Sequence, residues 1–160
     1  RYLDRITGKT ASLFGTAAQG GAMVAGVPAE QVEAMRVFGL HLGIAFQIVD
    51  DILDFTATSE ELGKPAGSDL LSGTVTLPTL LYMGRSPEDN PVKRAFEGVR
   101  RRANLQRAIN DIRASDLLDE SMVTARRFAQ SARDALAALP EGEPKATLDA
   151  LVDYVTERRN

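Results

Sequence analysis

The 160-residue sequence contains no cysteine and a single histidine, His41. Without cysteine, the chain forms neither a disulfide framework nor a thiolate metal site, and a reducing compartment is compatible with this composition. His41 is expected to pack or hydrogen-bond within the core, and we assign it no chemical role. Any metal ion would therefore be held by oxygen ligands.

The sequence also lacks an excess of positive charge. It has 19 Lys and Arg against 22 Asp and Glu, which gives a formal net charge of −3. The positive residues are spread along the chain and form no block of the kind that neutralises a phosphate backbone, so nucleic acid is not expected as a partner. The short run Arg100-Arg101-Arg102 is interpreted as a solvated face, and contact with a membrane surface or an acidic partner is the alternative.

No stretch has the length and polarity of a membrane span or a signal peptide. The most apolar stretch, residues 37–55, is interrupted by His41, Gln47 and three aspartates, and no window reaches about 18 clean apolar residues. We therefore expect no transmembrane segment and a cytoplasmic location. The sequence opens on Arg1-Tyr2-Leu3, without a methionine and directly in a helical pattern, which predicts that the chain begins inside a longer protein.

The residues that are present predict an all-α chain. Its length suits one domain, and 44% hydrophobic residues are ample for a core. No strand pair has a credible hairpin turn, and no internal repeat is found. A long loop is expected at 56–74, which contains three glycines. Helical patterns cover approximately residues 4–25, 29–55, 76–84, a segment starting at Ser86-Pro87, 103–115, 116–139 and 143–158. Small residues at helical spacing predict close helix packing at Gly15, Ala18, Gly21 and Ala22.

The sequence FQIVDDILDF, residues 46–55, places three carboxylates in an apolar helix. Residues three and four apart share a helix face, so Asp50 and Asp54 project together, with Gln47 one turn earlier. Asp51 lies about 100° around the axis. Unpaired carboxylates on an apolar helix carry a large desolvation cost, so the cluster requires a cation, and Mg²⁺ suits oxygen ligands completed by water and phosphate. The alternative is that the acids face solvent and pair with Lys or Arg.

The loop after this helix favours the metal site over the solvated alternative. Lys64 stands in GKPAGSD, ten residues after Asp54, and is flanked by glycines that let the backbone approach a ligand closely. A cation beside a metal-binding acidic cluster is the arrangement that a diphosphate needs.

Three stretches resemble one known family. Residues 45–82, AFQIVDDILDFTATSEELGKPAGSDLLSGTVTLPTLLY, are similar to the second aspartate-rich motif of trans-isoprenyl diphosphate synthases, the polyprenyl synthetase family. GKTASLF, residues 8–14, resembles the family's Lys-Thr segment, and LVDYVTERR, residues 151–159, resembles its C-terminal helix. The resemblance covers essentially the whole chain. It implies the C-terminal part of an isoprenoid-synthase-type helical bundle, with residues 1–160 as a portion of a single domain.

The resemblance implies a role for each matching charged residue. Asp50, Asp51 and Asp54 would bind Mg²⁺ that bridges to the diphosphate of an allylic substrate, with Asp50 and Asp54 favoured as direct ligands. Lys9 and Lys64 would contact that diphosphate. Taken alone, Lys9 would be a solvated surface lysine, and the Thr that follows it favours the functional interpretation.

Other roles follow from the same resemblance. Thr10 and Gln47 would line the reacting carbons, where their oxygen dipoles steady a developing allylic cation, and Phe46 would lie beside them. Asp69 would support the site from behind by ordering Lys64 or a metal-bound water. The alternative for Gln47 is a buried polar contact between helices. No histidine base is required, because in the family the diphosphate itself removes the last proton.

The expected function is a prenyltransferase that adds isopentenyl diphosphate to an allylic diphosphate and makes an all-trans polyprenyl diphosphate. The sequence of residues 20–56 resembles the family's long-chain branch more than its farnesyl branch. The family's first aspartate-rich motif and its arginines have no match here, so we expect a fragment that is inactive alone and, by resemblance, a homodimer. The alternatives are a non-catalytic partner subunit of a heteromeric synthase and a class I terpene cyclase. The family often has Lys at the position of Thr74, and Thr74 removes that phosphate contact.

Overall fold

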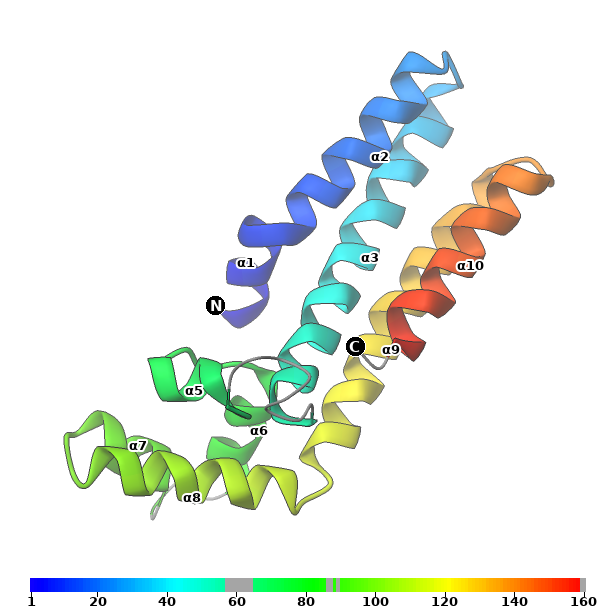
Figure 1. Cartoon of the computed structure of the whole chain (residues 1–160). Helices are drawn as coiled ribbons and strands as arrows, with labels where there is room; N and C mark the ends of the chain where they lie inside the picture. The colour runs from blue at the N-terminus through cyan, green and yellow to red at the C-terminus, as the bar shows by residue number, and fades with distance from the viewer. Residues whose placement is uncertain (57–64, 86–87, 89, 159–160) are drawn as a thin grey trace. The chain divides into compact units, whose positions relative to one another are not determined.

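The computed structural model describes residues 1–56, 65–85, 88 and 90–158, whose regular secondary structure is helical, with no strand among them (Figure 1). This confirms the predicted all-α class. The elements are α1 Tyr2–Ile6, the π-helix η1 Thr7–Ala11, α2 Ser12–Val24, α3 Ala29–Thr56, α5 Ser68–Ser72, α6 Leu77–Arg85, α7 Pro91–Phe96, α8 Arg101–Arg113, α9 Leu117–Ala135, the 3-10 helix η2 Leu136–Ala138 and α10 Glu143–Glu157.

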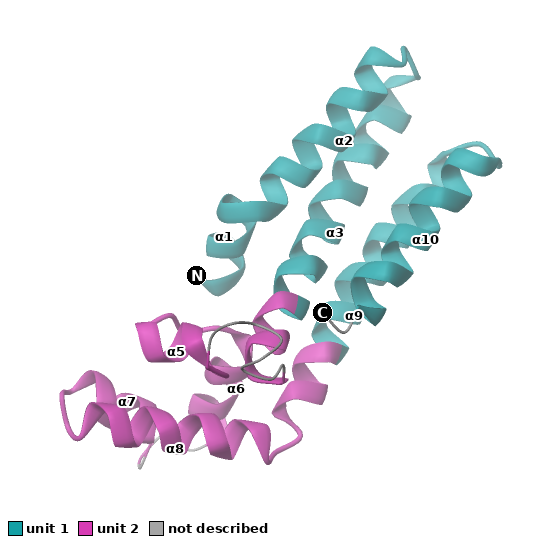
Figure 2. Cartoon of the chain, viewed as in Figure 1, with its two compact units in different colours: residues 1–49, 123–159 teal, residues 50–122, 160 magenta. Residues whose placement is uncertain are grey.

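Figure 2 divides the chain into two compact units, each with its own core. Unit 1 holds residues 1–49 and 123–159, and therefore α1, α2, most of α3 and α9, and α10. Its buried core comes from α3, α9, η2 and α10: Phe38, Leu42, Ala45, Ala129, Ala132, Leu136, Val152 and Val155. Unit 2 holds residues 50–122 and 160. Its core comes from the end of α3, from α5, α7 and α8, and from the start of α9: Phe55, Leu70, Val92, Ala95, Leu105, Ala108, Ile109, Ile112 and Leu117.

Two glycines of α3 bring this helix against the first helical segment. A Cβ built on Gly39 would lie 2.4 Å from the carbonyl oxygen of Phe14, and one built on Gly43 would lie 2.6 Å from the Cα of Ala11. Both distances are shorter than real side chains tolerate, so only glycine permits this spacing. The predicted close packing is confirmed at Gly15, which faces Arg36 and Leu40 on α3, whereas a Cβ on Gly21 meets nothing within 4 Å in the described residues.

The observed elements differ from the predicted ones in two places. The first helix is interrupted by the π-helix at Thr7–Ala11, and the predicted loop 56–74 contains the short helix α5. Ser86 and Pro87, where a further helix was expected to start, lie outside the described residues, and helix α7 begins at Pro91. Asn90 caps it, because its side-chain oxygen accepts hydrogen bonds from the N–H groups of Val92, at 2.9 Å, and Lys93, at 3.4 Å. Asn-Pro therefore starts this helix by the mechanism that was expected of Ser-Pro.

Helix α3 matches its predicted range of 29–55 and also passes a length-and-composition test for a membrane-crossing helix. Half of the apolar window that passes is buried inside the chain. The buried core helix of a folded protein passes the same test, so this is weak evidence for a span.

Candidate functional site

The π-helix lies at the residues that were predicted to contact substrate. Lys9 and Thr10 are both within η1, and Lys9 is exposed. The Thr10 hydroxyl donates a hydrogen bond to Oε1 of Gln47 at 3.1 Å, and Gln47 is only 6% exposed. The structure therefore brings together two predicted site residues that are 37 positions apart. Single π-helical turns are rare, and those that occur often lie at functional sites. Thr10 makes its contact with α3 from within this turn.

Phe46 is held from two sides within unit 1. Its ring centroid lies 5.6 Å from that of Phe14, and the guanidinium carbon of Arg158 lies 4.1 Å from the Phe46 ring centroid. Nη2 of Arg158 also donates to the carbonyl oxygen of Phe46 at 3.4 Å. This is a cation–π contact supported by a charged hydrogen bond. No role was predicted for Arg158, although it lies within LVDYVTERR, residues 151–159.

Asp54 is buried, at 3% exposure, and its carboxylate organises the start of α5. Oδ1 accepts a hydrogen bond from the Ser68 hydroxyl at 2.7 Å, and Oδ2 accepts one from the backbone N–H of Asp69 at 3.0 Å. The Asp54 carbonyl accepts another from the N–H of Gly67 at 2.7 Å. These contacts satisfy donors at the first turn of a helix, where a carboxylate also suits the helix dipole. Ser68 thus contacts a predicted site residue, although no role was predicted for Ser68 itself.

The conformation of Gly67 explains one glycine of the GKPAGSD stretch. Its φ of 72° lies in the left-handed region, and a Cβ there would stand 2.6 Å from Cγ1 of Ile109 in the core of unit 2. A residue with a side chain would meet both backbone strain and a steric clash. Gly67 therefore allows the chain to turn back toward Asp54.

The three aspartates of α3 have different environments. Asp51 is 4% exposed and buried like Asp54, whereas Asp50 is exposed. The alternative that all three acids face solvent is therefore wrong for Asp51 and Asp54. Within the described part of the chain, no three His, Cys, Asp or Glu side chains are gathered as a ready-made metal centre. Lys64 lies outside the described residues.

Known proteins are similar to this chain over nearly its whole length. The family model for polyprenyl synthetase matches residues 1–112. The chain belongs to the polyprenyl synthetase family. Two bacterial relatives are named heptaprenyl diphosphate synthase component 2. The one from Bacillus subtilis is 38% identical over 99% of this chain and 45% of its own length. The one from Geobacillus stearothermophilus is 41% identical over 98% of this chain and 49% of its own length.

Solved structures of the polyprenyl synthetase family share the fold. A heptaprenyl diphosphate synthase from Staphylococcus aureus superposes with a TM-score of 0.91 at 38% identity, covering 99% of this chain and 50% of that one. A polyprenyl synthase from Caulobacter crescentus, complexed with calcium and isoprenyl diphosphate, gives 0.88 at 40% identity and covers 49% of that chain. The chain thus spans about half the length of the relatives it matches. The resemblance seen in the sequence and the isoprenoid-synthase-type bundle are both confirmed, and the family is one of metal-dependent prenyltransferases.

Proposed function

We propose that the protein containing this chain transfers an allylic prenyl group to isopentenyl diphosphate and makes an all-trans polyprenyl diphosphate. The observation that carries this proposal is the cluster of carboxylates on the apolar helix α3, with Asp51 at 4% and Asp54 at 3% exposure. Three carboxylates within five residues of one apolar helix concentrate the oxygen ligands that a hard cation takes, which supports a cation-dependent task. The Caulobacter crescentus relative binds calcium and isoprenyl diphosphate, which supports diphosphate binding as that task.

Mg²⁺ would be held by the aspartates of α3. The donor set fits this ion, because carboxylate oxygens suit a hard cation and the chain contains no thiolate that would favour a softer metal. Exposed Asp50 is the most accessible ligand. Both oxygens of Asp54 already accept hydrogen bonds, so Asp54 would contribute through the lone pairs that remain. When bound, the metal neutralises and orients the charge of the substrate diphosphate.

Thr10 and Gln47 would steady positive charge on the reacting carbons. A hydroxyl has one proton and two acceptor positions, and Thr10 uses its proton on Oε1 of Gln47. The Thr10 oxygen can therefore present only lone pairs to a further neighbour, which suits a cation and not an anion. Fixed dipoles of this kind stabilise a developing charge without reorganising during the reaction. Phe46 would lie beside them, and its aromatic face also favours positive charge.

Cationic side chains would bind the leaving diphosphate. Lys9 is exposed on η1 and free to reach a phosphate group, and Lys64 would supply a second ammonium group, ordered by Asp69. Lysines aimed at the diphosphate stabilise the charge that develops as the carbon–oxygen bond breaks. The released diphosphate then takes the last proton, so the lone histidine is not needed as a base.

The names of two relatives favour a second assembly state. Both are called component 2 of a heptaprenyl diphosphate synthase, which describes those proteins as one part of a larger enzyme. The protein containing this chain would then work with a different partner chain instead of as a homodimer. The mass of the purified full-length protein, alone and after co-expression with its neighbouring genes, distinguishes these states. The relatives compared above carry prenyl synthase names, which do not favour a terpene cyclase.

Turnover of labelled isopentenyl diphosphate with farnesyl diphosphate and Mg²⁺ tests the proposed reaction in the full-length protein. We expect Asp50→Asn to lower kcat/KM by roughly 100-fold or more, the loss typical of removing a group that stabilises transition-state charge. Asp119→Asn is the matched control, because it removes an exposed carboxylate from α9. The 160-residue chain alone is expected to show no turnover. Equal activity of the two variants would contradict the proposed role of Asp50.

A further inference from the structure

The turn between α7 and α8 carries a concentrated positive charge together with exposed apolar side chains. We call residues 93–102 the basic turn. All residues from Phe96 to Ala103 are exposed, and Phe96 and Val99 retain 48% and 50% of their accessible surface. Five cations stand against the single acid Glu97 in this segment: Lys93, Arg94, Arg100, Arg101 and Arg102. The segment is strongly basic in a chain whose net charge is −3.

Backbone hydrogen bonds fix the shape of the basic turn. The N–H of Val99 donates to the carbonyl of Arg94 at 2.9 Å, and that of Gly98 donates to the carbonyl of Ala95 at 3.1 Å. Gly98 has φ 85°, so the pair forms the glycine-closed helix end known as a Schellman motif. The Asn104 side chain donates to the Val99 carbonyl at 2.7 Å. The exposure of Val99 is therefore set by the fold of the turn.

One arginine of the basic turn, Arg100, adopts an unfavourable backbone conformation. Arg100 has φ 39° and is the one non-glycine residue with positive φ in the described part of the chain. That region is unfavourable for a residue with a long side chain, and glycine or asparagine would occupy it with less strain. Within the described ranges, Arg100, Arg101 and Arg102 form no ion pair with an acidic side chain.

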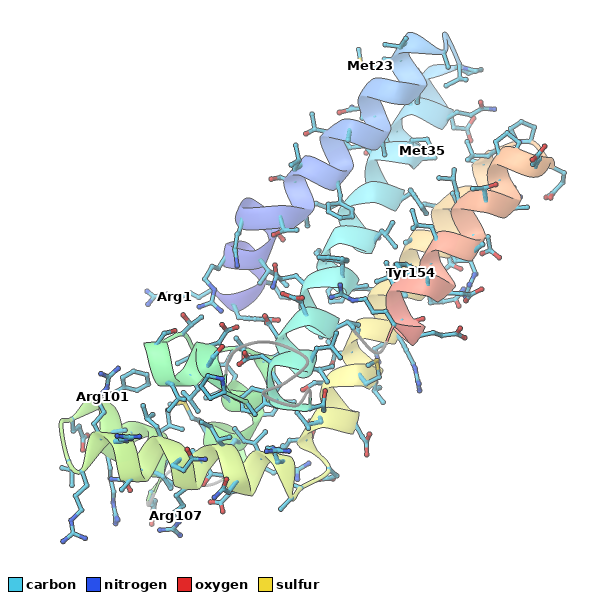
Figure 3. The ribbon with its side chains drawn as sticks, in the orientation of Figure 1. Arg1, Met23, Met35, Arg101, Arg107 and Tyr154 are labelled. Atoms are coloured by element: carbon cyan, nitrogen blue, oxygen red, sulfur yellow. The ribbon has the colours of Figure 1, made fainter. Side chains whose placement is uncertain are left out.

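Arg101 and Arg102 border a pocket of about 390 Å³ whose lining, among the described residues, also includes Leu71 and Leu105. Figure 3 shows Arg101 at the point where α7 meets α8. A surface that sets guanidinium groups beside leucine side chains matches a ligand with an anionic head and an apolar body.

We propose that the basic turn is a docking surface for an anionic lipid bilayer. Phe96 and Val99 enter the boundary between headgroups and acyl chains, while the arginines contact lipid phosphates, which is the layout of segments that lie on a membrane. Single-stranded nucleic acid would use the cations and would stack a base on Phe96, but it gains nothing from exposed Val99, so Val99 is the side chain that favours a bilayer. The proposal does not depend on the reaction proposed above.

Sedimentation of the full-length protein with vesicles tests this docking surface. We expect binding to vesicles of phosphatidylcholine and phosphatidylglycerol, weakening with added salt, and little binding to phosphatidylcholine alone. Each arginine near an anionic surface contributes about a five-fold factor, so Arg101→Gln with Arg102→Gln lowers the partition coefficient about 25-fold. The matched control is Arg126→Gln with Arg127→Gln, which removes the same charge from two adjacent exposed arginines of α9. An equal loss in both pairs, or no binding by the parent protein, overturns the proposal.

The variant Val99→Ser distinguishes binding to a bilayer from binding to any other polyanion. The near-isosteric Val99→Thr repeats the test with the side-chain volume preserved. We expect both variants to melt like the parent protein, to lose part of their vesicle binding, and to bind heparin or an RNA oligonucleotide no differently from the parent. If both variants bind vesicles as the parent does while the arginine pair loses vesicle and heparin binding alike, the surface is a general anion-binding surface. The bilayer proposal is then wrong.

Discussion

Gly43→Ala tests whether the close approach of α3 to the first helical segment holds the candidate site together. The added methyl group would lie 2.6 Å from the Cα of Ala11, 3.0 Å from its Cβ and 3.1 Å from the Cβ of Phe14. The closest of these atoms belongs to backbone, which cannot move aside as a flexible side chain can. The two segments must therefore separate at this point.

The expected size of the effect follows from two opposing terms. Replacing a helical glycine with alanine stabilises a helix by about 1 kcal/mol. Overpacking a close contact costs about 1–3 kcal/mol, and a backbone contact belongs at the upper end of that range. Gly43→Ala therefore lowers the free energy of unfolding by about 1–2 kcal/mol. Gly21→Ala in α2 gains up to about 1 kcal/mol, because no described atom lies within 4 Å of the new methyl group.

Thermal melting of the two variants, compared with the parent protein, measures this difference. For a chain of this size, 1 kcal/mol shifts Tm by about 2–4 °C, so a separation of about 2 kcal/mol places the two variants roughly 4–8 °C apart. Ala11 follows Thr10, and Gly43 lies one turn before Gln47, so Gly43→Ala should also lower turnover of the full-length protein. A Gly43→Ala variant that melts at or above the parent temperature would show that the close approach is not required.

Three further outcomes are expected. Asp54→Ala lowers the free energy of unfolding by about 2 kcal/mol in denaturant titration, because the hydrogen bonds that start α5 are lost, whereas exposed Asp50→Ala leaves it nearly unchanged. Asn90→Ala lowers it by about 1 kcal/mol through loss of the α7 cap, and Asn90→Ser restores most of that loss. Arg85 donates to Asp116 and holds the pKa of that carboxyl below its ordinary value of 3.8. Asp116→Asn therefore lowers Tm at neutral pH, and the difference from the parent fades as the pH falls below about 4, where the carboxylate of the parent becomes protonated.

Helix positions could be predicted because their signals are local. The helical pattern predicts a helix over residues 29–55, and α3 runs from Ala29 to Thr56. The start of α7 at Pro91 was not predicted, because Ser86-Pro87 and Asn90-Pro91 carry the same local capping signal. Ser86 and Pro87 lie outside the described residues. Pro91, Val92 and Ala95 are buried in α7, so packing supports the start at Asn90-Pro91 in a way that local spacing does not show.

The π-helix and α5 were missed for a related reason. Neither is encoded by a short-range pattern, because η1 has the composition of an ordinary helix and α5 is only one turn long. Helix α5 depends on the Asp54 carboxylate, which reaches Ser68 and the backbone of Asp69 from 14 and 15 positions earlier in the chain. A helix this short is marginal in water without such contacts.

The sequence by itself determined the chemistry of this chain: an aspartate cluster on an apolar helix, a nearby lysine loop, and the family that carries them. These features depend on residue type and on spacing within a few turns, which the helical period converts directly into a shared face. Only the tertiary structure decided that Asp51 and Asp54 are buried while Asp50 is exposed, and that Thr10 meets Gln47 across 37 positions. Those outcomes depend on how closely separate helices approach. Gly39 and Gly43 permit a close approach because they have no side chain.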